Sequence, residues 1–600
     1  MEKRNGKWGA FFSKRGRLAA VILAVALAAV LAVGIWAPGS GESGGDHLAG
    51  VGQTEMQEAF DVFADRVFAS HVQTDTLTMH YKVADPAAYG LDDSAVSWGV
   101  ISGQALREGL EAEKEEYETL QSFDYSQLTG EQQLTYDVLS AYMEQDMKLE
   151  GMELYQEVLG EYGGIQAQLP VLLSEYAFYT QEDVEEYLEL CRQIPSYFQQ
   201  IIAFEKEKAD AGLFMSDSNV DGVLEQCAAF IENPEENVLI ETFPEHLDQL
   251  SGISEEQRAQ WTAENEAAVK EAVIPAYELL IRELTALKGR GMEGSPADLP
   301  MGKEYYEVRA QMAVGSSKTV EEMKTMIAEA LLEQMAQMEE LTENHPAITA
   351  RVSASAYPSG TWEALLNDLK SRITSDFPAL GQVSYEVNTV HPSLQEHLNP
   401  AFYLIPPLDR AKENVIYINE SPEYDQSDLY LTLAHEGFPG HLYQNVYFAE
   451  KQMEPVRYVL GFPGYSEGWA TYVENLAYDY MDTMEEEERE FLRANSFASL
   501  GLYAQMDIGV NYDGWSLEKL KDFIELYFDV SDERVIQDIY DMMTNDPANY
   551  LSYFVGCLEF GELREKAQQV WGDAFSPMEF HKRILDIGPA PFDVVEKYLL

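Results

Sequence analysis

Apolar residues recur every three or four positions along most of the chain, a spacing that predicts a mainly α-helical protein. One long run of this kind follows Thr319, whose hydroxyl stands three residues before Glu322, as a helix N-cap requires. The same pairing at Thr180–Asp183 predicts another helix start. We therefore expect a large helical body over residues 53–600.

The pattern changes from helical to strand-like between residues 383 and 419. Val383, Tyr385 and Val387 alternate with polar neighbours, and short apolar runs follow at residues 402–405 and 415–418. These segments predict a small β-sheet placed just before a histidine-rich motif. An edge strand of such a sheet can bind an extended peptide through main-chain hydrogen bonds.

The N-terminus has the pattern of a membrane-targeting segment. A basic head over residues 1–17, expected to be cytoplasmic, precedes an unbroken run of apolar or small residues over 18–37, which is long enough to span a bilayer. Residues 38–52, rich in glycine, serine and charge, predict a flexible linker. We expect an uncleaved signal anchor, with a cleaved signal peptide as the alternative. Either leaves the body outside the cytoplasmic membrane, anchored or secreted.

Charge and cysteine content narrow the function further. The formal net charge is −64, from 104 acidic and 40 basic residues, and so acidic a surface repels nucleic acid. The cysteines Cys191, Cys227 and Cys557 are widely spaced, which predicts buried free thiols rather than a disulfide framework or a thiolate metal site.

The most informative motif is the seven-residue stretch from His435 to His441, because two imidazoles and the carboxylate of Glu436 suggest a zinc site with its own general base. On an ideal helix a spacing of six residues rotates the second histidine by about 240° from the first, so both cannot face one metal. Pro439 and Gly440 allow the helix to break between them. We therefore expect a distorted or terminated helix here. The alternative is a pair of structural histidines in a turn.

A downstream helical segment supplies the expected third ligand. Glu467 and Glu474 are seven residues apart and share a helical face. We assign Glu467 as the ligand, and Glu474 or Thr471 as the group that orients a histidine from behind. For Glu474 an ordinary exposed glutamate is the alternative.

The His435–His441 motif with Leu442-Tyr443-Gln444, and the stretch from Glu467 to Tyr472, resemble the bacterial domain-of-unknown-function family 885. That family is similar to zinc metallopeptidases of the gluzincin type. The resemblance implies a helical fold with a deep cleft beside the sheet, Zn²⁺ held by two histidines and a glutamate, and Glu436 as general base. Weaker matches are Asn419, expected to bind substrate, and Tyr553 and Arg564, expected either to stabilise an oxyanion or to bind a substrate carboxylate, with Tyr553 as the catalytic residue and Arg564 as the substrate-binding one. For Tyr553 and Arg564, packing or a structural salt bridge is the alternative.

The sequence thus predicts an extracytoplasmic zinc peptidase that hydrolyses short peptides, with exopeptidase and oligopeptidase action both open. One alternative is a surface-binding protein that keeps the fold without the chemistry. Another is a zinc amidase that acts on cell-wall or other non-peptide amides. Metal content and substrate screening separate the three.

Overall fold

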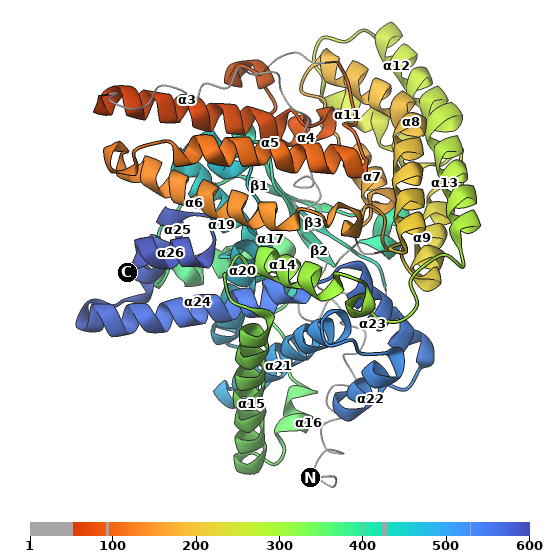
Figure 1. Cartoon of the computed structure of the whole chain (residues 1–600). Helices are drawn as coiled ribbons and strands as arrows, with labels where there is room; N and C mark the ends of the chain where they lie inside the picture. Colours follow the sequence, from red (N-terminus) through yellow and green to blue (C-terminus); the bar gives the residue numbers. More distant parts are fainter. Residues whose placement is uncertain (1–51, 92–94, 162, 399, 423–428, 529) are drawn as a thin grey trace.

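The computed structural model describes residues 52–600, except for 92–94, 162, 399, 423–428 and 529 (Figure 1). The predicted cytoplasmic head, the membrane segment and nearly all of the linker lie outside the described residues. Within the part that is described, no helix combines the length and the apolar character needed to cross a membrane.

Three strands form one small sheet in the otherwise helical body. β1 (Tyr385–Thr389) pairs in parallel with β3 (Asn414–Ile418), and β2 (Ala401–Leu404) pairs antiparallel with β3. The strand order β1-β3-β2 leaves β2 at an edge. All three predicted strand segments are therefore confirmed, with β1 beginning two residues later than Val383.

The first half of the chain supplies two groups of helices. One lies across the top left of Figure 1, and the other forms a layer at the right. The first group is α3 (Gln53–Val72), α4 (Thr76–Lys82), α5 (Gly103–Gln121) and α6 (Gly130–Asp146). The second is α7 (Ile165–Ser174), α8 (Gln181–Ala211), α9 (Asp217–Phe230), α10 (Val238–Glu241), α11 (Phe243–Gln249), α12 (Glu255–Ala268) and α13 (Ile274–Leu287).

The second half builds the centre and the lower part of the molecule. Before the sheet come α14 (Gly302–Val314), α15 (Val320–Asn344), α16 (Ile348–Val352) and α17 (Trp362–Arg372). After it come α18 (Leu429–Glu436), α19 (His441–Glu450), α20 (Pro463–Ala477), α21 (Glu486–Asn511), α22 (Leu517–Tyr527), α23 (Glu533–Asn545), α24 (Asn549–Trp571), α25 (Pro577–Ile587) and α26 (Phe592–Leu599).

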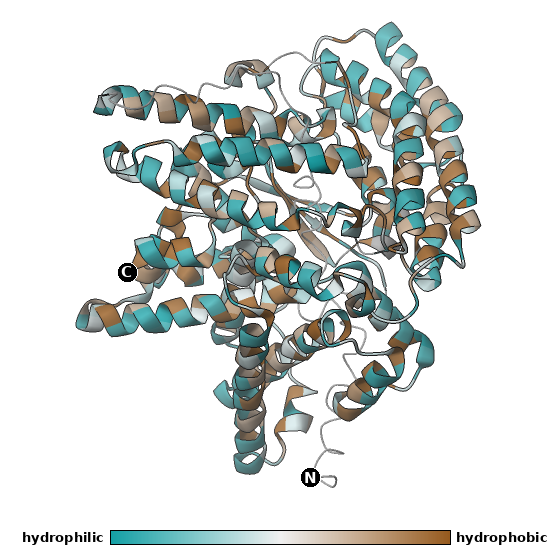
Figure 2. Ribbon diagram, in the orientation of Figure 1, coloured by the Kyte–Doolittle hydropathy of each residue, from teal (hydrophilic) through white to brown (hydrophobic). Residues whose placement is uncertain are grey.

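The predicted helix starts and the amphipathic pattern are confirmed. Thr180 caps α8 and Thr319 caps α15, each in a reciprocal capping box with the carboxylate three residues on. In Figure 2 the long outer helices carry hydrophilic and hydrophobic residues in alternation along their length, as helices with one buried face do. Cys191, Cys227 and Cys557 are buried free thiols, as predicted.

Two hydrophobic cores meet at the sheet. The first core is formed by α3, α5, α6, α14 to α26 and one face of the sheet, and the second by α7 to α13 and the other face, while α4 contributes to both. Because side chains alternate along a strand, Tyr403 of β2 packs in the first core while its neighbour Phe402 packs in the second. We call this boundary between the two cores the seam. The histidine motif, which begins at His435, comes after the last strand of the sheet in the chain.

Candidate metal centre

The two histidines of the motif lie at the facing ends of two short helices. α18 ends one residue after His435 and α19 begins at His441, so the helix break predicted from Pro439 and Gly440 is confirmed. A Cβ atom on Gly440 would lie 1.7 Å from the carbonyl oxygen of His435, so only glycine fits this turn. The indole Nε1 of Trp469 donates to the Pro439 carbonyl at 2.9 Å and ties the turn to α20. The break brings the two imidazole rings to a centroid distance of 4.9 Å.

Glu467, on α20, joins the two histidines in a group able to hold a metal ion. Its Oε2 atom lies 3.4 Å from Nε2 of His435 and 3.5 Å from Nε2 of His441. A tetrahedral zinc with bonds of about 2.1 Å holds its ligand atoms about 3.4 Å apart. The observed spacing between the carboxylate and each imidazole therefore matches zinc coordination.

The hydrogen bonding of these three residues also fits a metal ligand set. Nε2 of His441 and both carboxylate oxygens of Glu467 are buried and make no hydrogen bond in the described part of the chain. Buried polar atoms without partners are costly, and coordination to a cation removes that cost. Two imidazoles and one carboxylate are also a donor set used by catalytic zinc sites. The residues present therefore fit Zn²⁺.

Two further carboxylates border the three ligand residues. Oε2 of Glu474 lies 3.2 Å from Nδ1 of His435, the ring nitrogen that faces away from Glu467. Glu436 is buried, and its Oε2 accepts a hydrogen bond of 3.0 Å from the backbone N–H of Tyr403. The Tyr403 contact could not be predicted, because a backbone donor leaves no mark in the sequence. It joins Glu436 to the edge strand β2.

The electrostatics of the site follow from burial and from the histidines. Burial raises the pKa of Glu467, but the nearby His441 and His435 outweigh it and lower that pKa to about 2. Burial lowers the pKa of His435, yet Glu467 and Glu474 raise it well above its usual value. Burial raises the pKa of Glu436. Burial, with Glu467 and Glu436 nearby, also raises the pKa of Tyr553, so its hydroxyl stays protonated and able to donate.

A close crossing of α20 and α24 places Tyr553 at the metal centre. A Cβ atom on Gly468 would lie 2.4 Å from a backbone atom of Gly556, so the two helices touch where both residues are glycine. Gly468 directly follows Glu467, and Gly556 is one turn after Tyr553. The ring of Tyr553 accordingly lies with its centroid 6.3 Å from that of His435.

Asn419 and Thr471, two further predicted site residues, have surroundings other than those expected for their roles. Asn419 is fully buried, donates to the carbonyls of Gln395 and Leu398, and accepts from the Ser421 backbone. Thr471 is buried one turn beyond Glu467, and no described hydrogen bond joins its hydroxyl to a histidine. The structure thus places Asn419 in a network that holds the loops around the strands together.

Arg564 lies three turns beyond Tyr553 on α24, about 16 Å along the helix at 1.5 Å per residue. Its guanidinium interacts with the Tyr472 phenol, and that phenol is 2.9 Å from Nε2 of His581. The structure therefore brings Tyr553 to the metal ligands but places Arg564 elsewhere.

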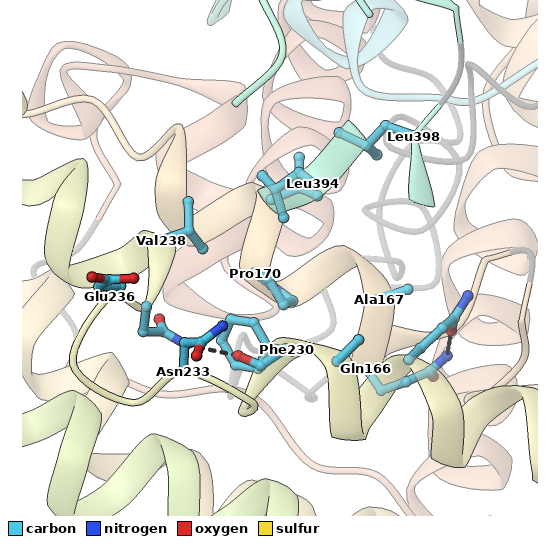
Figure 3. Close-up of a pocket in the computed structure, with 13 residues that line it drawn as sticks. Gln166, Ala167, Pro170, Phe230, Asn233, Glu236, Val238, Leu394 and Leu398 are labelled. Atoms are coloured by element: carbon cyan, nitrogen blue, oxygen red, sulfur yellow. Dashed lines mark hydrogen bonds between the residues drawn. The ribbon is translucent and has the colours of Figure 1, made fainter. Parts of the chain in front are cut away.

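A cavity shown in Figure 3 lies apart from the metal ligands. It is enclosed by α7, α9, the start of α10 and the turn that leads into β2, and Figure 3 labels Pro170, Phe230 and Leu398 among its walls. Its apolar walls belong to or pack against the second core, whereas Glu436 and Tyr403 lie on the first-core face of the sheet. The cavity is thus separate from the metal centre.

Two solved structures share this fold at low sequence identity. One is a predicted lipoprotein from Colwellia psychrerythraea, with a TM-score of 0.77 and 18% identity, covering 91% of this chain and 98% of that one. The other is a predicted lipoprotein of unknown function from Shewanella oneidensis, with a TM-score of 0.58 and 16% identity, covering 91% and 99%. At these identities the likeness shows the fold alone.

No curated protein matches the chain. The model of one protein family matches residues 86–599, which is most of the length. That family is described as bacterial protein of unknown function, DUF885, and this chain belongs to it.

Proposed function

We propose that the protein is an extracytoplasmic zinc peptidase that hydrolyses peptide bonds of short peptides. The observation that carries this proposal is the convergence of His435, His441 and Glu467 at zinc-ligand spacing, with buried atoms that lack hydrogen-bond partners, beside the carboxylate of Glu436. Bound zinc would polarise a substrate carbonyl and acidify a water molecule. The remaining chemistry belongs to this chain's own residues.

Glu436 has the position of a general base. The Tyr403 N–H donates a hydrogen bond to Oε2 of Glu436. This bond fixes the carboxylate and leaves Oε1 to accept a proton from water. As the water oxygen bonds to the carbonyl carbon, Glu436 takes the proton and then delivers it to the leaving amine. The C–N bond breaks, one water is consumed, and, once both of its protons are on the leaving nitrogen, the products are a carboxylate and an ammonium group.

Tyr553 is proposed to donate a hydrogen bond to the carbonyl oxygen as negative charge develops on it. Its ring lies beside that of His435, and its hydroxyl makes no hydrogen bond among the described residues. A donor already in place at this point stabilises the transition state more than the ground state.

The edge strand β2 is proposed to bind the substrate backbone. The Tyr403 N–H points away from β3 to Glu436, and the Pro400 carbonyl accepts from the Asn419 N–H on the β3 side. By the alternation of an antiparallel pair, the backbone groups of Ala401 then point away from β3 as well. An extended peptide can pair with them.

The location is also a proposal. Residues 18–37 would anchor the chain or direct its secretion, and the two solved structures with this fold are described as predicted lipoproteins, which supports a site outside the cytoplasm.

Elemental analysis and peptide turnover of the full chain test the function. We expect one zinc per chain in the wild type. Glu436→Gln should retain zinc and lower turnover about 10²- to 10⁴-fold, because it removes the base and keeps the ligands. His435→Ala should lose the metal.

Two results would contradict the proposal. A wild-type protein without stoichiometric zinc would favour the binding protein, and unchanged turnover in Glu436→Gln would remove Glu436 as the base. Cleavage of cell-wall fragments but of no library peptide would instead favour the amidase.

A further inference from the structure

Arg309, on α14, has hydrogen-bond donors that the described protein does not use. Its Nε atom is buried and has no hydrogen-bond partner, and among the described residues its guanidinium makes no hydrogen bond and no ion pair within 4 Å. In a chain with 104 acidic residues, Arg309 thus has no direct ion pair among the described residues. Arginine presents a planar fork of N–H groups that suits a carboxylate.

α14 holds Arg309 at the seam. Ala310 packs in the first core, while the ring of Tyr305 lies 5.2 Å from that of Tyr155, in the segment that leads into the second core. The metal centre also lies at the seam, through the contact of β2 with Glu436.

The contacts of α14 join it directly to the helices of the metal centre. A Cβ atom on Gly464, in the first turn of α20, would lie 2.0 Å from the Val314 carbonyl oxygen, so α14 and α20 touch. Tyr306 donates to Asp507 at 2.8 Å, and Asp507 accepts from the Ala548 N–H just before α24. Arg309 lies between these contacts on α14, and α20 and α24 carry Glu467 and Tyr553.

Two acidic residues, Asp146 and Asp546, interact electrostatically with Arg309 without using its donors. Burial raises the pKa of Asp146 to about 7 and that of Asp546 to about 6, and Arg309 opposes both shifts. Asp546 also contributes to the raised pKa of Tyr553, after burial and the nearer glutamates. Arg309 and Tyr553 therefore share Asp546 as an electrostatic neighbour.

We infer that Arg309 binds the free C-terminal carboxylate of the substrate, so that the protein acts as a carboxypeptidase-type exopeptidase. This inference rests on the proposed function. It gives to Arg309 the carboxylate-binding role that the sequence suggested for Arg564, whose guanidinium interacts with the Tyr472 phenol. A peptide paired with β2 would then extend along the seam from Glu436 to Arg309.

The first experiment measures binding without turnover. A panel of acetylated dipeptides, each as free acid and as C-terminal amide, is titrated into the metal-free full chain. We expect the acids to bind about 10- to 100-fold more tightly than the amides, the size of a charge-assisted hydrogen bond. Arg309→Gln should remove this difference, and Lys303→Gln, which changes an exposed cation on the same helix, should keep it. Equal binding of acid and amide by the wild type would overturn the inference.

The second experiment compares kcat/KM of the zinc-loaded protein on longer peptides with free or amidated C-termini. Arg309→Gln should slow hydrolysis of the acids to the rate of the amides and leave the amides unchanged. An equal loss on both would show a structural role and overturn the inference. Where Arg309→Gln does not fold, Arg309→Lys keeps the charge without the fork, and its acid preference should fall at least about threefold. Acid-selective binding without hydrolysis would reject the peptidase proposal while leaving the carboxylate site in place.

Discussion

At the residue scale, Glu474 lies behind His435, a proposed metal ligand. Its Oε2 atom lies 3.2 Å from Nδ1 of His435, and this leaves Nε2 directed at Glu467. A carboxylate behind a ligating histidine fixes its tautomer and ring position. Glu474→Gln should therefore weaken zinc affinity about 10- to 100-fold, measured by competition with a chelator.

The matched control for this prediction is Glu486→Gln, an exposed glutamate in the first turn of α21. It should leave zinc affinity unchanged. Equal affinities of the Glu474 variant and the wild type would mean that Glu474 does not orient the ligand.

Sequence spacing predicts the relative positions of site residues that share a helix, and it does not predict those of residues on distant segments. Glu467 and Glu474 could be paired because helical spacing fixes their relative positions. For Arg564 and Asn419 the sequence offers only a resemblance to the family, and a resemblance does not say which way a side chain points. No motif or spacing in the sequence marks Arg309 as a binding residue, because its neighbours come from distant segments of the chain.

At the element scale, glycines allow the helices that carry Glu467 and Tyr553 to approach each other. A Cβ on Gly468 would lie 2.4 Å from the backbone of Gly556, which cannot move aside as a side chain can. Gly468→Ala should lower stability by about 1–3 kcal/mol, as overpacking in a core does, and should also lower activity by shifting Glu467 from Tyr553. Urea unfolding and peptide turnover measure the two effects.

Gly561→Ala is the control, because a Cβ at this position of α24 meets no atom within 4 Å. Alanine in a helix is favoured over glycine by about 0.5–1 kcal/mol, so this variant should be as stable as the wild type or more so. Similar losses of stability in Gly468→Ala and Gly561→Ala would show that the close crossing of α20 and α24 is not the reason why alanine is unfavourable at Gly468.

The boundaries of helices and strands can be predicted from neighbouring residues in the sequence, whereas the close crossing of α20 and α24 cannot. Capping residues marked the starts of α8 and α15, and alternation marked the strands, because these depend on neighbours in sequence. The break between α18 and α19 followed from helix periodicity with Pro439 and Gly440. The contact of α20 with α24 depends on segments far apart in the chain, and no periodicity reveals it.

At the scale of the whole molecule, the excess of acid extends into the interior. Burial raises the pKa of several carboxyl groups to about 7, and neighbouring charges and hydrogen bonds add to or oppose this effect. These groups are Glu116, Asp146, Glu161, Glu175, Glu205 and Asp507. In the unfolded chain such groups ionise near pH 4 to 4.5. The folded protein therefore holds more protons than the unfolded chain between about pH 4 and pH 7.

This difference sets the sign of the pH dependence. Where the native state binds more protons, stability falls as pH rises, so the contribution of these groups is largest below about pH 4 and is lost above about pH 7. The thermal unfolding midpoint should be higher at pH 5 than at pH 8. Glu175→Gln keeps an acceptor for the Tyr417 hydroxyl but removes one such group, so it should narrow the difference. Glu486→Gln, on the surface, should not change it. A midpoint that rises from pH 5 to pH 8 would mean that the buried carboxyl groups ionise near their usual pKa and that other charges determine the stability.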